Sequence, residues 1–235
     1  MLKRLTTLCL FSACCLLQLL PAASEEIVTT DIAIIGLHTA PTMRTVIING
    51  DSERPIRISR SSVPPTVHYQ GPPALTIHDE NHFGEDIPPL CTVNLKGNAE
   101  ETIILIVGNS ESGGDKKYRA AAIPVSKSKF PPGSRLLYNF TKYDIRGQMA
   151  KLPYKAGSKE NRVFQVASGQ PALVDSPNGQ PLEPFGVRME SNQDGKWKKF
   201  SQTRWFHNEK QRSFIFILPK ARGDGLTMRA FADTL

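Results

Sequence analysis

Short apolar or alternating runs, separated by clusters of turn-forming residues, recur along nearly the whole chain after its first two dozen residues. Alternation with a period of two places side chains on opposite faces of a β-strand, and short runs bounded by Gly, Pro, Asn or Asp are typical of strands. A helical period is almost absent from the same region. The pattern therefore predicts an all-β fold.

Fifteen runs are expected to form strands. They are 27–37, 45–48, 56–59, 66–69, 75–78, 91–95, 103–107, 118–123, 135–140, 146–152, 163–166, 185–190, 197–206, 214–218 and 226–231. Two of them, 103–107 and 214–218, are almost purely apolar. Such strands are covered on both faces in folded proteins, so we expect these two in the interior.

Turn signals lie between the runs. Residues that tolerate a positive φ occur at 49–51, 96–98, 177–179 and 193–195, and the first of these predicts a hairpin between 45–48 and 56–59. Proline pairs at 64–65, 72–73, 88–89 and 131–132 lack the amide hydrogen that a strand ladder needs. We expect them at strand ends and edges.

The runs divide at a connector rich in Pro, Gly and Ser, residues 126–133. This division predicts an N-terminal β-sandwich over 25–125 and a C-terminal β-domain over 126–235. One large sandwich would give the same local pattern, because sequence does not fix which strands pair. Both arrangements stay open at this stage.

The N-terminus has the order of a secretory signal. Lys3 and Arg4 precede an apolar run, 5–20, and small residues follow at 21–24. We expect a signal peptide over 1–24 with cleavage near Ser24, and hence export to the periplasm or the cell surface. A lipoprotein cut at Cys14 is the alternative, although it would leave an apolar segment on the mature chain. No transmembrane segment is expected after cleavage.

Removal of the signal lowers the formal net charge from +7 to +5, because Lys3 and Arg4 are lost. So small an excess argues against dedicated nucleic-acid binding. Cys91 would be the one cysteine left, which rules out an intrachain disulfide. It alternates with Val93 and Leu95, so we interpret it as a small buried hydrophobe.

Three segments carry a resemblance to a known family. They are 69–72, 130–135 with Asn139 following, and 197–219 from Trp197 through Thr203-Arg204-Trp205 to Pro219. In these segments the chain resembles a family of exported bacterial β-rich proteins whose function is uncharacterised, over about residues 63–231. The resemblance implies an envelope location and a β-sandwich of the immunoglobulin-like sort. It brings no catalytic residues.

One cluster has atoms suited to a metal ion. His78 and His82 are followed by Glu85 and Asp86, and imidazoles with carboxylates can hold Zn²⁺ or a harder ion. Gly84 and Pro88 favour a loop, where polar residues also collect because they are solvated. The sequence leaves the metal site and the solvated loop as alternatives.

A second segment interleaves both tryptophans with basic groups, at Trp197, Arg204 and Trp205. Exposed rings beside cations can stack on sugars or meet acidic groups. The alternative is burial in the core, with Trp205 inward and Arg204 outward. Further upstream, Arg54, Arg57 and Arg60 are interpreted as a solvated strand face.

These observations predict a non-enzymatic envelope protein that acts as a structural or interaction module, with no catalytic residue and no cofactor. Its expected partners are other envelope or appendage proteins. A carbohydrate- or polyanion-binding module at Trp197, Arg204 and Trp205 is the first alternative. A metal-assisted hydrolase at His78 and His82 is the second.

Overall fold

The structure is a computed structural model that describes residues 26–49, 54–81, 84, 86–108, 118–151, 161–175, 182–220 and 224–234. Every regular element within these ranges is a strand, so the prediction of an all-β fold is confirmed. The expected signal peptide and Cys14 lie outside the described residues. Across the ranges given, no helix has the length and apolar character needed to cross a bilayer.

The first half of the chain forms one sheet. Its strands are β1 (Val28–Leu37), β2 (Thr45–Ile48), β3 (Ile56–Ser59), β4 (Val67–Gly71), β5 (Ala74–Asp79), β6 (Cys91–Asn94), β7 (Glu101–Gly108) and β8 (Tyr118–Val125). Their order is β6-β5-β2-β3-β1-β7-β8, with β4 paired to β1. The sheet folds over so that β6 lies beside β8. We call this unit the N-terminal body.

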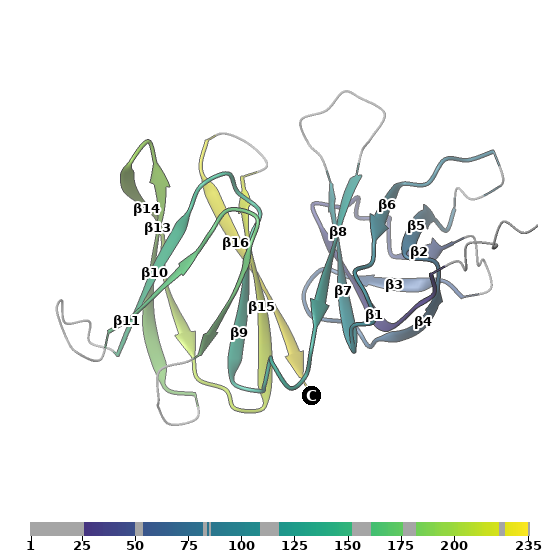
Figure 1. The fold of residues 1–235 in the computed structure, drawn as a ribbon. Helices are drawn as coiled ribbons and strands as arrows, with labels where there is room; N and C mark the ends of the chain where they lie inside the picture. Colours follow the sequence, from purple (N-terminus) through teal and green to yellow (C-terminus); the bar gives the residue numbers. More distant parts are fainter. Residues whose placement is uncertain are drawn as a thin grey trace, which may run out of the picture.

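The second half forms two four-stranded sheets. Its strands are β9 (Ser134–Asn139), β10 (Ile145–Lys151), β11 (Arg162–Val166), β12 (Pro171–Asp175), β13 (Pro184–Gln193), β14 (Lys196–Phe206), β15 (Gln211–Pro219) and β16 (Leu226–Thr234). The β9 sheet has the order β12-β9-β15-β16, and the β13 sheet has the order β11-β10-β13-β14. Together they form a sandwich-like C-terminal body beside the N-terminal one (Figure 1).

Local sequence signals are confirmed at several turns. Asn49 has a φ of 47°, and β2 and β3 on either side of it pair antiparallel, as a hairpin requires. Asp194 and Gly195, with φ of 54° and 77°, reverse the chain between β13 and β14. The four proline pairs all fall between strands. The turn expected at 177–179 lies outside the described residues.

Three apolar cores stack through the molecule. The N-terminal core fills the folded first sheet, and the C-terminal core lies between the β9 and β13 sheets. A third cluster, which we call the junction core, joins residues of β1 and β7 to residues of β9, β15 and β16. The two bodies therefore share buried apolar surface, and burial of this kind is the main favourable contribution to folding.

Alternation explains how two strands serve two cores each. In β7, Ile104 belongs to the N-terminal core and Leu105 to the junction core. In β15, Phe216 belongs to the junction core and Ile217 to the C-terminal core. The runs 103–107 and 214–218 are thus covered on both faces, as predicted, and they lie on the two sides of the same interface.

A buried ion network crosses this interface. Arg212 of β15 donates from Nη2 to Glu101 of β7 at 2.7 Å and from Nε to Asp233 of β16 at 2.7 Å. The Arg212 guanidinium also lies 5.3 Å from the ring centre of Phe130 in the connector. The network and the junction core fix the two bodies against each other.

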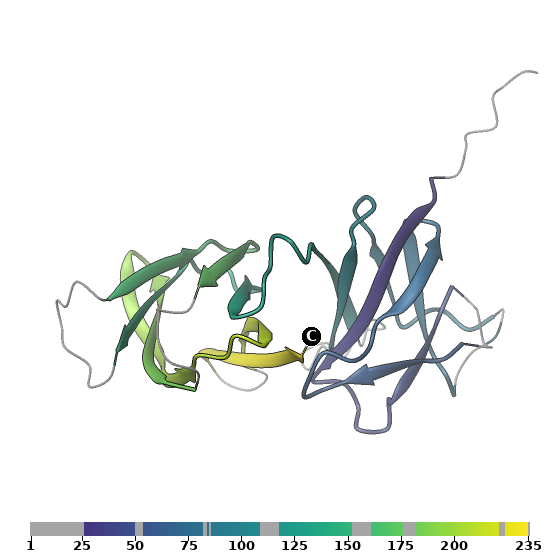
Figure 2. The same ribbon diagram turned by 90° about the horizontal axis from the view of Figure 1, so that it is seen from below.

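A backbone contact joins the bodies at a second place. The N–H of Val63 donates to the carbonyl of Ala232 at 2.9 Å, and Ser62 forms a parallel bridge with the same residue. The end of β16 lies between the two bodies, next to this contact (Figure 2). The loop after β3 is therefore tied to a strand of the other body.

Candidate functional site

The predicted histidine pair is described only in part. His78 is half-buried on β5, opposite Ile47 of β2. His82 and Glu85 lie outside the described residues, and Asp86 is exposed. In the part of the chain that the structure describes, no group of three or more His, Cys, Asp or Glu residues is placed to hold a metal ion. The metal site stays a prediction.

The thiol of Cys91 is half-buried on β6, while Val93 and Leu95 of the same face are buried in the N-terminal core. Burial raises the pKa of the Cys91 thiol to about 11, because the charged thiolate is poorly solvated there. The thiol is therefore protonated at neutral pH, in a position typical of a packing residue.

The two tryptophans face opposite sides of the β13 sheet. A β-bulge shifts the register of β13 and β14, so that Lys199 pairs with Glu190 while Ser201 pairs with Met189. One extra residue in a strand reverses the side on which the following side chains lie. Trp205 faces the C-terminal core, with its ring 6.2 Å from that of Phe185.

Trp197 lies on the outer face of the same sheet, where the Arg146 guanidinium sits 4.4 Å from its ring centre. Arg204, paired with Gly186, is exposed on that outer face. The structure thus brings Trp197 and Arg204 to one surface and places Trp205 elsewhere. Parity counted along the sequence could not find this grouping, because the bulge is invisible there.

An ion cluster lies in the middle of the outer face. Glu190 accepts hydrogen bonds from Nε of Arg146 at 2.6 Å and from Nη2 of Arg188 at 2.5 Å. Burial alone would raise the pKa of Glu190, but the hydrogen bonds and charges of the two arginines outweigh it and lower that pKa. The cluster lines a cavity of about 340 Å³ that also includes Val163. One positive charge is left in excess.

A larger groove lies at the junction of the two bodies and has a volume of about 650 Å³. Residues of the β8 end, the connector, β9 and β12 line it; among them are Val125, Phe130, Leu136, Pro171 and Leu173. Leu173 is 47% exposed and belongs to β12, an edge strand that pairs only with β9 within the described sheets. Asn98, Glu100, Ser126 and Lys129 also line it, so the groove is a largely apolar channel with polar groups beside a free strand edge.

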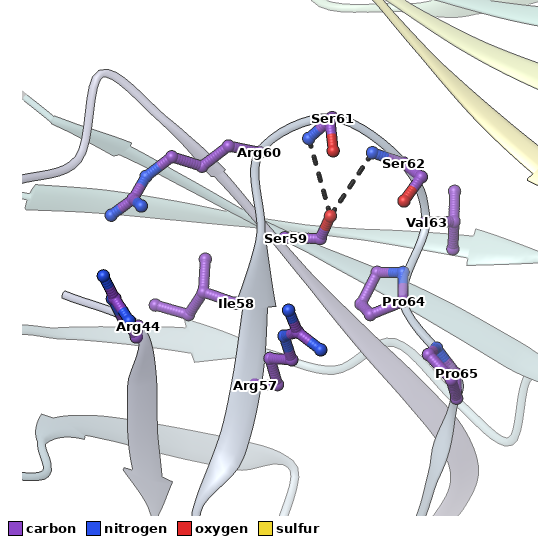
Figure 3. Close-up of a pocket in the computed structure, with 10 residues that line it drawn as sticks. All are labelled: Arg44, Arg57, Ile58, Ser59, Arg60, Ser61, Ser62, Val63, Pro64 and Pro65. Carbon is purple, nitrogen blue, oxygen red and sulfur yellow. Dashed lines mark hydrogen bonds between the residues drawn. The ribbon is translucent and has the colours of Figure 1, made fainter. Parts of the chain in front are cut away.

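A third hollow is basic and has a volume of about 410 Å³. It is lined by Arg44, Arg57, Ile58, Ser59, Arg60, Ser61, Ser62, Val63, Pro64 and Pro65. Figure 3 shows the side chains of Arg44 and Arg57 on either side of Ile58, with the loop 60–65 arching above them. Arg54, Arg57 and Arg60 are exposed, as predicted, and Arg57 and Arg60 also line this hollow.

Arg60 has a structural task in this pocket. Its Nε donates to the hydroxyl of Thr39 at 3.1 Å, and Nη2 donates to the carbonyls of Ala40 and Met43, the latter at 2.6 Å. The guanidinium thus braces the turn between β1 and β2. Its charge is not neutralised by these contacts, since carbonyls are neutral acceptors.

No family model and no curated protein matches this chain. Its function must therefore be inferred from the three surfaces described above.

Proposed function

We propose that the protein is an exported, non-enzymatic component of the cell envelope that binds other envelope or appendage proteins. The signal pattern at 1–24 supports export to the periplasm or cell surface. The facing sheets of the C-terminal body, between which the chain crosses repeatedly, support the immunoglobulin-like type of sandwich. The single observation that carries the binding role is the junction groove beside the free edge of β12.

A free strand edge presents a row of N–H and C=O groups that another extended chain can pair with. Beside β12 this edge adjoins a largely apolar channel, so a paired segment could also bury its own apolar side chains. Leu173 connects the edge to the groove, because it pairs with Leu136, whose side chain packs on the junction core. The occupant we propose is an extended, apolar segment of a partner protein.

Preorganisation strengthens this proposal. The groove walls come from both bodies, and the Arg212 network and junction core hold those bodies in one arrangement. A rigid groove loses less entropy on binding than one that must first close. The groove therefore suits lasting capture of a partner segment.

Site-specific photo-crosslinking in the cell tests the proposal. A photoreactive residue at Leu173 is expected to give a discrete adduct with an envelope protein, and Leu173→Asp should weaken capture of that protein about ten-fold. The matched control is Leu182, an exposed apolar residue (67%) that lines none of the hollows described above. Equal adducts at both positions, or none at 173, would contradict the role of the groove. Cell fractionation and the mass of the processed chain test export separately.

A second candidate function is supported by the outer face of the β13 sheet. This face carries an aromatic ring and several cations, as sugar- and polyanion-binding surfaces do. They belong to Trp197, Arg146, Arg188 and Arg204. Under this function, Trp197→Ala would abolish binding to peptidoglycan fragments in a sedimentation assay. Phe206→Ala, which removes an exposed ring at the far end of β14, is the control and should leave binding intact.

A further inference from the structure

The basic pocket beside β3 holds cationic groups that the fold itself does not use. None of its ten lining residues is acidic. Among the described residues, neither Arg44 nor Arg57 forms an ion pair or a side-chain hydrogen bond. The carboxylate of Glu80 is bound by the hydroxyl of Thr45 and does not line the pocket.

The walls of the pocket are fixed before any ligand arrives. Arg60 ties β3 to the turn at Ala40 and Met43, and the Ser59 hydroxyl accepts the backbone N–H of Ser62 at 3.3 Å. Val63 is held to the other body through Ala232, and two prolines follow it. A ligand would therefore meet a formed cavity, which lowers the entropy lost on binding.

The lining also has an apolar part: Ile58 lies between Arg44 and Arg57, while Pro64 lies on the Arg57 side with Val63 next to it in the loop (Figure 3). A guanidinium binds carboxylate and phosphate groups with paired hydrogen bonds. A carboxylate is attached directly to carbon, so its apolar body can cover these walls. A phosphate is surrounded by oxygen atoms and would leave the walls without a partner.

We propose that this pocket is a binding site for a carboxylate with an adjoining apolar group, clamped between Arg44 and Arg57. The carboxylate can belong to a free organic acid or to an acidic side chain flanked by apolar residues in a partner chain. The site is independent of the junction groove. It assigns a binding role to a strand face for which the sequence alone predicts only exposure to solvent.

Calorimetric titration of the processed chain at low ionic strength tests the proposal. The probes are 3-methylbutanoate, the blocked tripeptide acetyl-Val-Glu-Val-amide and inorganic phosphate. The variants are Arg44→Gln and Arg57→Gln, with Arg119→Gln as the matched control because Arg119 is an exposed arginine of the same body outside the pocket. All three side chains are exposed, so the variants are expected to fold, and thermal melts verify this.

We expect saturable binding of a carboxylate probe that Arg44→Gln and Arg57→Gln each weaken by at least about ten-fold, the worth of one charge-assisted hydrogen bond. Arg119→Gln should change it by less than about two-fold. Preference for the free acid identifies a small-molecule source, and preference for the tripeptide identifies a partner chain. Tighter binding of phosphate, equal losses in all three variants, or no saturable binding in the millimolar range would each overturn the site. None of these results bears on the crosslink at Leu173.

Discussion

Two ion clusters use the same chemistry in opposite arrangements. At the junction one buried cation, Arg212, lies between two carboxylates, Glu101 and Asp233, and the exposed Lys127 lies 3.4 Å from Glu101. On the outer face of the β13 sheet one carboxylate, Glu190, lies between two arginines. The side chain of Arg212 is 2% exposed, whereas those of Arg146 and Arg188 are 40% and 48% exposed. The contrast separates an ion network with a buried cation from one in which a buried carboxylate is held by two arginines that are open to solvent.

Burial decides how much each cluster matters to stability. At the junction, burial alone would lower the pKa of Arg212, but hydrogen bonds and charges from its two carboxylates raise that pKa overall. Loss of one partner there leaves uncompensated buried charge, which is costly. On the outer face, water screens the arginines and each ion pair contributes little. Positive charge on that face remains available to a ligand.

The largest expected effect is at the junction. Arg212→Leu should lower the free energy of unfolding by about 3–5 kcal/mol, because half-buried Asp233 loses its cation and buried Glu101 keeps only Lys127, at 3.4 Å. Urea unfolding at neutral pH measures this. The matched change on the outer face, Arg188→Leu, should cost less than about 1 kcal/mol. Equal decreases in the free energy of unfolding in the two variants would contradict the difference between the junction and the outer face.

An intermediate effect is expected beneath the outer cluster, at Gly147. A Cβ placed there would lie 2.0 Å from the Phe164 ring, which covers this glycine from β11. Gly147→Ala should therefore cost about 1–3 kcal/mol through displacement of the ring. Thermal unfolding gives the value. If Gly147→Ala lowered the free energy of unfolding by less than Arg188→Leu does, the ion pairs of the outer face, rather than the packing below them, would stabilise this sheet.

The smallest effect is the contribution of the Glu190 charge. Because the folded-state pKa of Glu190 is lowered, its stabilisation is present above the unfolded-state pKa and is lost as the pH falls through the folded-state value. Glu190→Gln should cost less than about 1 kcal/mol at neutral pH, and the difference from the parent should shrink as the pH falls below about 4. Urea unfolding across this range measures it, and a difference that grows in acid would contradict the assignment.

Local features of the fold were predictable from the sequence, since they depend on alternation and turn chemistry. The double covering of 103–107 and 214–218 followed from their apolar side chains alone. The sequence did not predict strand β12, because it begins with Pro171 and most of its side chains are exposed. It therefore lacks the run of apolar residues that marks the other strands. Pairings between distant segments, such as the parallel pairs β1 with β7 and β9 with β15, have no local signature.

The candidate sites were harder to predict for the same reason. Trp197 and Arg204 share a face only because of a bulge, and Arg44 and Arg57 line one pocket only because β2 pairs with β3. Glu101 and Arg212 are too far apart in the chain for any spacing rule to join them. Sites built from tertiary contacts become visible only when the strands are placed.

The tie between Val63 and Ala232 has a consequence for the order of assembly. Synthesis from the N-terminus produces the pocket loop well before β16. The loop cannot take its final position until that later strand docks. During this interval the nascent molecule would expose apolar strands to water, so its maturation depends on how quickly β16 follows.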